Sequence, residues 1–271
     1  SSQNVEKIDI RINIPEKSPH LIITGKNGTG KTILLKAIVR HLALSNFDYK
    51  GGEIDIQYKN GEKIGKNWAD KKFIIYFYGA ERRSEMEEPK NPTKPNLQIG
   101  ANTAKSLTNQ FLYFLSDLKI QEALARNEQQ IEDADKIKQW FESFENILQE
   151  IYEDKELKLE FNYRDYSFFI ITKGKRFKFT EMSDGFTAAI DIIADLILKM
   201  QTENSLTRDY EKQGIVLVDE IETHLHLELQ KIIMPLLTRV FPNIQFIVTT
   251  HSPFVLNSMN NAVAYDLEHR E

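Results

Sequence analysis

The sequence predicts an α/β fold with a mostly parallel core sheet, and three observations support this prediction. A short apolar run at residues 21–24 leads through a glycine-rich turn into an amphipathic helix at residues 31–44. A second apolar run ends at Asp219 and Glu220, and a third ends shortly before His251. Strands that alternate with helices favour a parallel sheet, and such sheets bind ligands at the carboxyl ends of their strands.

Composition and charge restrict the class of protein. The chain has 271 residues, 41% of them hydrophobic and 28% charged, so a sizeable core is available. A net charge of -5 excludes a wholly basic nucleic-acid coat, and the absence of cysteine excludes disulfides, thiolate zinc sites and cysteine nucleophiles. No apolar run approaches the roughly 18 residues of a membrane span, and residues 1–4 lack the features of a signal peptide. We therefore expect a cytoplasmic protein without a membrane contact.

Residues 1–96 are expected to form the N-terminal part of the core. Isoleucines at alternate positions of residues 8–14 predict a half-buried strand, and an Asn-Gly turn within residues 54–64 predicts a hairpin. Together these segments predict an antiparallel strand layer at the N-terminal end of the fold. Residues 73–78 are apolar and predict a further buried strand.

Residues 97–186 are expected to form a lobe inserted between the two halves of the core. A helical and acidic pattern covers most of this segment, with twelve acidic and five basic residues between positions 121 and 160. Three short segments at its end predict antiparallel strands. They lie at residues 157–163, 167–172 and 176–180.

Residues 187–271 return to alternating helices and strands and are expected to complete the core. Helices are predicted at residues 187–200 and 225–240, and strands at 215–218, 245–249 and 263–265.

An apolar stripe runs along one predicted helix of the lobe. It consists of Trp140, Phe144, Ile147, Leu148 and Ile151. The stripe either packs on the strands of the lobe or docks, in part, an effector or a second ATPase. The acidic residues beside it, Glu142, Glu145 and Glu150, disfavour DNA at this surface.

A basic hairpin precedes the last part of the lobe. It carries Lys173, Lys175, Arg176 and Lys178. Two interpretations stand side by side: a solvated hairpin and a contact to DNA or RNA.

The glycine-rich turn is the strongest chemical signal. Residues 25–32 read Gly-Lys-Asn-Gly-Thr-Gly-Lys-Thr and fit the P-loop pattern between a strand and a helix. Its glycines allow consecutive backbone N–H groups to point at phosphate oxygens, and the helix N-terminus adds its dipole. Lys31 would neutralise the β- and γ-phosphates, and Thr32 would offer its hydroxyl to Mg²⁺. The turn therefore predicts binding of ATP through Asn27, Gly28, Thr29, Gly30, Lys31 and Thr32.

Two further candidates follow predicted strands. Asp219 suits the shell of Mg²⁺, and Glu220 suits a general base that polarises water. Alone, this pair also fits a solvated acidic turn. His251 follows a strand expected beside the Asp219 strand, which favours a γ-phosphate sensor over a structural histidine.

Ser183 and Gly185 open the helix predicted from residue 187. A serine and a glycine at a helix N-terminus can bind an anion, but Ser183 taken alone indicates a simple N-cap.

The order of these motifs resembles ABC-type ATPase heads, the class that includes the heads of SMC and double-strand-break-repair proteins. Residues 220–226, Glu-Ile-Glu-Thr-His-Leu-His, and residues 265–268, Tyr-Asp-Leu-Glu, are more closely similar to the AAA-domain abortive-infection ATPases. That group includes heads of OLD nucleases and of Septu and retron-associated phage-defence systems. The resemblance covers about residues 5–80 and 180–268.

The resemblance implies a role for each motif. Residues 25–32 would be Walker A, Asp219 and Glu220 would be Walker B, and His251 would be the switch histidine. Ser183 and Gly185 would belong to the signature motif, which caps the γ-phosphate bound by a partner subunit. Residues 223–226 would lie on the D-loop that touches this partner.

The resemblance also implies an assembly and a biological role. The reaction would be Mg²⁺-dependent ATP hydrolysis in a head-to-tail homodimer. The protein would be the sensor or motor of a bacterial antiviral system with a separate nuclease or toxin as effector. The alternative is an SMC-like DNA-repair or chromosome-structure head, which would need a long coiled coil in the insertion.

The sequence departs from the patterns of related heads in two places. The residues before Gly25 contain no Phe, Tyr or Trp to stack on adenine, and no glutamine directly follows residues 73–78. Gln98 is the remaining candidate for the Mg²⁺-sensing glutamine. A transporter ATPase would have both an aromatic residue before Gly25 that stacks on adenine and a glutamine directly after residues 73–78. His224 and His226 could be a metal pair, but a helix is expected to begin here and favours the D-loop interpretation.

Overall fold

The structure is a computed structural model, and it describes residues 20–43, 73–82, 85–91, 93–97, 106–201 and 212–269. The strand predicted at residues 8–14, the hairpin predicted at residues 54–64 and Gln98 lie outside these residues. The N-terminal antiparallel layer therefore stays a prediction.

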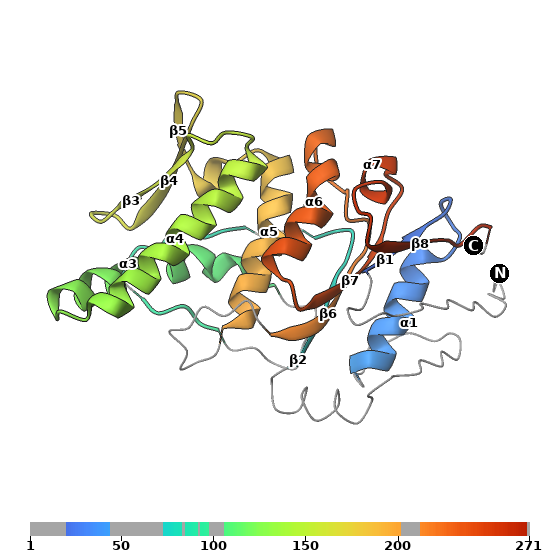
Figure 1. The fold of residues 1–271 in the computed structure, drawn as a ribbon, viewed down its shortest axis with the longest axis horizontal. Helices are drawn as coiled ribbons and strands as arrows, with labels where there is room; N and C mark the ends of the chain where they lie inside the picture. Colours follow the sequence, from blue (N-terminus) through green and yellow to red (C-terminus); the bar gives the residue numbers. More distant parts are fainter. Residues whose placement is uncertain are drawn as a thin grey trace. The chain divides into compact units, whose positions relative to one another are not determined.

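The chain divides into two compact units, each described by itself (Figure 1). The first consists of residues 1–82, 101–104 and 210–271, and the second of residues 83–100 and 105–209. The domain boundaries expected at residues 96 and 186 stay a prediction.

In the residues that the structure describes, the first unit forms a five-stranded sheet in which every pairing is parallel. Its strands, in spatial order, are β2 (Phe73–Tyr78), β6 (Gln213–Val218), β7 (Ile244–Thr249), β1 (His20–Thr24) and β8 (Ala262–Asp266). The predictions of an α/β fold and of a strand pair formed by residues 215–218 and 245–249 are confirmed.

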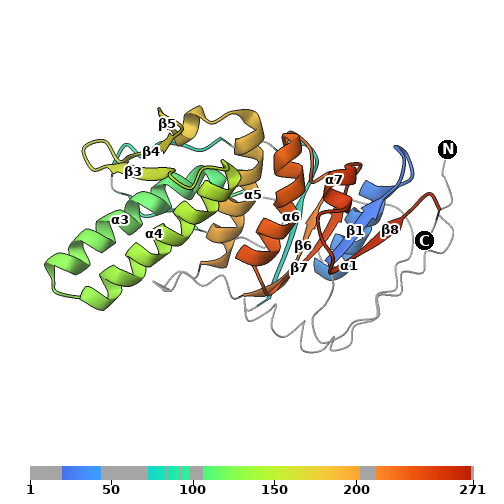
Figure 2. The same cartoon turned by 45° about the horizontal axis from the view of Figure 1, so that its top comes forward.

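Helices cover both faces of this sheet because its strands carry apolar side chains on both sides. Helix α1 (Lys31–Ala43) packs Leu35 and Val39 against Ile23 and Leu217 on one face. Helix α6 (Leu227–Val240) lies on the side of the sheet away from α1 (Figures 1 and 2). The short helix α7 (Pro253–Leu256) follows β7.

The second unit combines a helical hairpin with a small antiparallel sheet, as predicted. The hairpin consists of α3 (Phe111–Asn127) and α4 (Ile131–Ile151), and a 3-10 turn, η1 (Thr108–Gln110), precedes it. The sheet consists of β3 (Lys158–Asn162), β4 (Ser167–Thr172) and β5 (Lys175–Lys178). A second 3-10 turn, η2 (Phe179–Glu181), leads into α5 (Asp184–Met200).

The apolar stripe of α4 is buried inside the second unit. The Trp140 ring meets the Phe114 ring edge-on at 5.6 Å, and the Phe144 ring meets Phe111 at 5.4 Å. The stripe therefore packs inside the lobe, but its partners are rings of α3 and the Phe179 ring of η2, where the strands of the lobe were expected. The interpretation that this stripe docks another protein is wrong, because its side chains are buried within the lobe.

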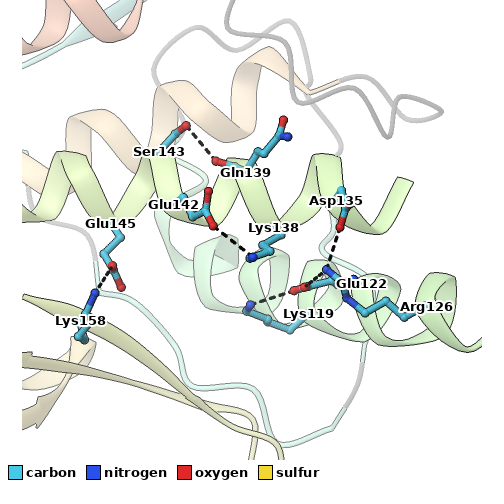
Figure 3. A network of polar contacts seen from close by, with 10 residues as sticks. All are labelled: Lys119, Glu122, Arg126, Asp135, Lys138, Gln139, Glu142, Ser143, Glu145 and Lys158. Atoms are coloured by element: carbon cyan, nitrogen blue, oxygen red, sulfur yellow. Dashed lines mark hydrogen bonds and ion pairs between the residues drawn. The ribbon is translucent and has the colours of Figure 1, made fainter. Parts of the chain in front are cut away.

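Ion pairs connect the acidic helix α4 to its neighbours (Figure 3). Arg126 of α3 lies 3.1 Å from Asp135, and the Glu145 carboxylate accepts a hydrogen bond of 2.8 Å from the backbone N–H of Leu159. Glu145 also lies 3.5 Å from Lys158. Exposed pairs contribute little to stability, so these contacts mark which residues of α4 lie beside α3 and β3 and add little to the packing of the buried stripe.

Gly214 of β6 lies where no side chain fits. A Cβ at this position would lie 2.4 Å from both Cγ1 and the carbonyl oxygen of Ile74, and 3.1 Å from Cδ1 of Ile244. We expect Gly214→Ala to lower the free energy of unfolding by about 1–3 kcal/mol, the usual penalty for overpacking. Urea denaturation measures this change.

Gly79→Ala is the matched control, because the nearest atom to a Cβ there is 3.9 Å away. It should change the free energy of unfolding by about 0.5 kcal/mol or less. Equal losses in the two variants would contradict the close approach of β6 and β2.

Candidate functional site

The loop between β1 and α1 has the backbone that its glycines predict. Gly25, Gly28 and Gly30 have φ values of 130°, 84° and 95°. A side chain at Gly28 or Gly30 would meet no atom within 4 Å, so the backbone conformation, and not lack of space, requires glycine there. The Thr29 hydroxyl donates to the carbonyl of Lys26 at 2.9 Å and closes the turn.

Lys31 begins α1 and folds back over this loop. Its ammonium donates to the carbonyl oxygens of Gly25 at 2.7 Å and Lys26 at 3.1 Å. Burial lowers the pKa of Lys31, while the carboxylates of Glu220 and Asp219 act in the opposite direction. The backbone carbonyls of the loop thus hold the ammonium of Lys31.

Asp219 directly follows β6 and is buried. Its Oδ1 accepts a hydrogen bond of 2.6 Å from the hydroxyl of Thr249, the last residue of β7. The same hydroxyl accepts the backbone N–H of Glu220 at 2.8 Å. Thr249 therefore connects both acidic residues, a role that the sequence analysis missed; a threonine at the end of the neighbouring strand was the available signal.

Glu220 has a left-handed backbone, with a φ of 46°. A residue with a side chain rarely adopts this conformation, and such residues gather at functional sites. Its Oε2 accepts a long hydrogen bond of 3.3 Å from the Thr223 hydroxyl.

Arg82 lies beside this turn. Its Nη1 donates to the carbonyl oxygens of Gly79 at 3.2 Å and Asp219 at 2.9 Å. Its Nη2 donates to those of Glu220 at 3.1 Å and Ile221 at 2.9 Å. The sequence analysis did not select Arg82, because backbone acceptors leave no side-chain pattern in a sequence.

Glu222 connects the turn to the segment after β7. Its Oε2 accepts the Thr250 hydroxyl at 2.7 Å, and its Oε1 accepts the backbone N–H of His251 at 2.5 Å. The imidazole of His251 is exposed. The bonds of Glu222 fix where His251 leaves the sheet.

His224 and His226 are exposed and precede α6. The described part of the chain contains no group of three or more His, Cys, Asp or Glu residues that could hold a metal ion. The metal-pair alternative therefore has no support there.

Parallel pairing brings these first-unit segments together. Ile23 of β1 is opposite Thr249 of β7, and Val218 of β6 is opposite Val248 of β7. Consequently the P-loop, the Asp219–Glu220 turn and the segment leading to His251 leave the same edge of the sheet.

Ser183 lies in the second unit and occupies the N-cap position of α5. Its side chain makes no capping hydrogen bond to the helix, so the simple N-cap interpretation does not explain the hydroxyl. Ser183 is exposed and Gly185 is buried. Ser183 also lines a cavity of about 480 Å³ with Tyr152, Phe177 and Phe186.

Two of the four cations of the basic hairpin form ion pairs with carboxylates of the second unit. Arg176 lies 2.7 Å from Glu160, and Lys178 lies 2.5 Å from Glu88. The Lys173 ammonium donates to the carbonyl of Tyr152 at 3.2 Å. These pairs favour the solvated-hairpin interpretation over a nucleic-acid contact.

The loop, the strand order and the acidic turn define a P-loop nucleotide-binding fold. Comparison with known families then identifies the chain more closely: residues 80–257 match the family described as "AAA domain, putative AbiEii toxin, Type IV TA system". The chain belongs to this family.

Curated relatives support the same placement. The chain is 29% identical to the Septu protein PtuA of Bacillus mycoides (strain KBAB4) over 98% of this chain and 39% of that protein. It is 38% identical to the "Retron Vc95 probable ATPase" of Vibrio cholerae serotype O1 biovar El Tor over 34% of this chain and 18% of that protein. The chain thus spans well under half the length of these relatives.

Among solved structures, the fold is similar to an SMC head bound to the C-winged helix domain of ScpA. The likeness covers 93% of this chain and 87% of that chain at 15% identity, with a TM-score of 0.46. No helix in the described residues is both long enough and apolar enough to cross a membrane.

Thr249→Val tests the bridge between β7 and the acidic turn. Valine keeps the shape but leaves the buried Asp219 carboxylate without a donor and the Glu220 N–H without an acceptor. We expect the free energy of unfolding at neutral pH to fall by about 1–3 kcal/mol, because unsatisfied buried groups are costly.

Thr238→Val provides the comparison, since the Thr238 hydroxyl only donates to the carbonyl of Pro235 in its own helix. Its effect should be about 0.5 kcal/mol or less. A Thr249→Val variant as stable as Thr238→Val would contradict the bridge.

Proposed function

We propose that this chain binds ATP with Mg²⁺ at the edge of its parallel sheet and hydrolyses ATP by in-line attack of water on the γ-phosphate. One observation carries the proposal most strongly. The same sheet edge carries the glycine-rich loop, whose carbonyl oxygens hold the buried ammonium of Lys31, and the acidic turn. The carboxylates of that turn raise the pKa of Lys31 against the effect of burial.

The residues present fit a nucleotide and a divalent cation. The left-handed glycines leave the loop free of side chains, so its backbone N–H groups can approach phosphate oxygens. Lys31 would exchange the carbonyls of Gly25 and Lys26 for the β- and γ-phosphates. Asp219 and the hydroxyl of Thr32 would hold Mg²⁺, which when bound neutralises charge on the phosphates. Thr249 keeps Oδ1 of Asp219 in place, and Oδ2 would bind Mg²⁺.

Two residues would act on the γ-phosphate side. Glu220 would accept a proton from the attacking water, because its carboxylate has a single long hydrogen bond, from Thr223, within the described part of the chain. His251 would sense the γ-phosphate from the end of β7, where Glu222 holds its backbone. Asn27, Gly28, Thr29 and Gly30 would contribute backbone donors.

Substitutions at Lys31 and Glu220 separate binding from chemistry. Lys31→Ala should abolish ATP binding, because the loop loses the ammonium that would neutralise the β- and γ-phosphates. Glu220→Gln should retain binding but lower turnover by about a hundredfold or more, as expected for loss of a general base. A fluorescent ATP analogue measures binding, and phosphate release measures turnover. Glu220→Gln hydrolysing ATP at the wild-type rate would exclude Glu220 as the base.

We further propose that two chains bind two ATP molecules head-to-tail. The support is Ser183, whose exposed hydroxyl caps nothing in its own helix. In this assembly Ser183 and Gly185 would cap the γ-phosphate held by the other subunit, and residues 223–226 would meet that subunit.

ATP should therefore drive dimerisation of the hydrolysis-deficient Glu220→Gln protein, and Ser183→Arg should prevent it, because a large cation would replace the small hydroxyl. Light scattering with and without ATP measures the mass. Thr180→Arg, at an exposed position of η2 in the same unit, is the control and should still dimerise. A mass unaffected by ATP and by Ser183→Arg would exclude this sandwich as the nucleotide-dependent assembly.

The proposed biological role is a cytoplasmic ATPase of an antiviral defence system that acts with a separate nuclease or toxin. The relatives named Septu PtuA and retron ATPase support this role. The SMC-like alternative has less support, because α3 and α4 span only 17 and 21 residues. Co-purification of a neighbouring gene product with the wild-type chain tests the role.

A further inference from the structure

We propose that Arg82 is a positioning residue for hydrolysis: its guanidinium holds the backbone of Glu220 in the left-handed turn and thereby aims the carboxylate of the base. The inference rests on the proposed function and assigns a residue to the same site. It would make the rate of hydrolysis, rather than the affinity for ATP, depend on Arg82.

The geometry gives Arg82 an unusual set of acceptors. Its two terminal nitrogens reach the carbonyl oxygens of three consecutive residues, 219–221, at 2.9–3.1 Å, and that of Gly79 at 3.2 Å. Consecutive carbonyls of an extended strand point in alternate directions, so they can converge on one group only because the chain turns at Glu220. Arg82 is therefore complementary to the turned backbone and not to an extended one.

A cation at this place stabilises a conformation that is otherwise disfavoured. A φ of 46° is uncommon for a residue with a Cβ, and three carbonyl dipoles directed at one point repel one another. Charge-assisted hydrogen bonds from a planar guanidinium offset both effects. Lysine would supply the charge but not the fork that reaches separate acceptors.

The backbone of Glu220 is held from two sides while its side chain is nearly free. Thr249 accepts the N–H of Glu220 at 2.8 Å, and Arg82 donates to its carbonyl at 3.1 Å. Among the residues that the structure describes, the carboxylate has one partner, the Thr223 hydroxyl at 3.3 Å. Such an arrangement fixes the backbone position from which the Glu220 side chain extends and leaves the carboxylate oxygens available to a water molecule.

Steady-state kinetics with a matched arginine control tests the inference. Arg82→Ala should lower kcat by about tenfold to a hundredfold, the range expected when a catalytic group is misplaced, and leave KM and the affinity for an ATP analogue within about threefold. Arg126→Ala removes an arginine of the second unit that bridges Glu122 and Asp135, and it should leave kcat unchanged.

Chemical rescue distinguishes positioning from general stability. Guanidinium chloride at low millimolar concentration should restore part of the kcat of Arg82→Ala, because the free ion can occupy the vacated place, and should not raise the kcat of the wild type. If Arg82→Ala does not fold, Arg82→Lys carries the test: it keeps the charge, and its kcat should fall while KM remains.

Three outcomes separate the claims. A wild-type kcat in the Arg82 variants, beside an inactive Glu220→Gln protein, would overturn the inference alone. A loss of nucleotide affinity that parallels the loss of kcat, without guanidinium rescue, would overturn it too. Absence of turnover in the wild type itself would instead refute the proposed function.

Discussion

Parallel pairing of β1, β7 and β6 is the constraint on which the rest of the site depends. It makes three segments that are far apart in the sequence end at one sheet edge: the P-loop after β1, the acidic turn after β6 and the His251 segment after β7. An antiparallel neighbour would place one of these segments at the opposite edge. Gly214 belongs to the same constraint, because a side chain there would push β6 away from β2.

The acidic turn converts this edge into a chemical site. Asp219 is buried and oriented by Thr249, whereas Glu220 lies in a strained turn with a loosely held carboxylate. Neighbouring carboxylates thus have different environments, as expected if one binds a cation and the other moves a proton. The hydrogen bonds of Thr249, Arg82 and Glu222 connect the turn to β7 and to the end of β2.

The sequence predicted most elements and the three motifs of the first unit, because apolar periodicity and glycine spacing report directly on backbone and burial. It also predicted that the stripe through Trp140 and Phe144 forms one helix face. It could not fully predict what this face contacts, since the partners Phe111 and Phe114 follow a separate periodicity.

Contacts to the backbone were beyond prediction for a similar reason. Arg82 is 137 to 139 residues from the carbonyls of the acidic turn, and no side-chain pattern marks such acceptors. The left-handed conformation of Glu220 is likewise invisible, because glycine, the usual residue there, is absent. The sequence also could not reveal that the Ser183 side chain makes no capping hydrogen bond, because this depends on the geometry at the N-cap of α5.

The most direct test of the central claim is a crystal structure of the Glu220→Gln protein with ATP and Mn²⁺, read by anomalous scattering. The account predicts a manganese peak bound by Asp219 and Thr32, with the ammonium of Lys31 on the phosphates and no longer on the carbonyls of Gly25 and Lys26. Nucleotide or manganese bound away from this sheet edge, with Lys31 still on those carbonyls, would contradict it.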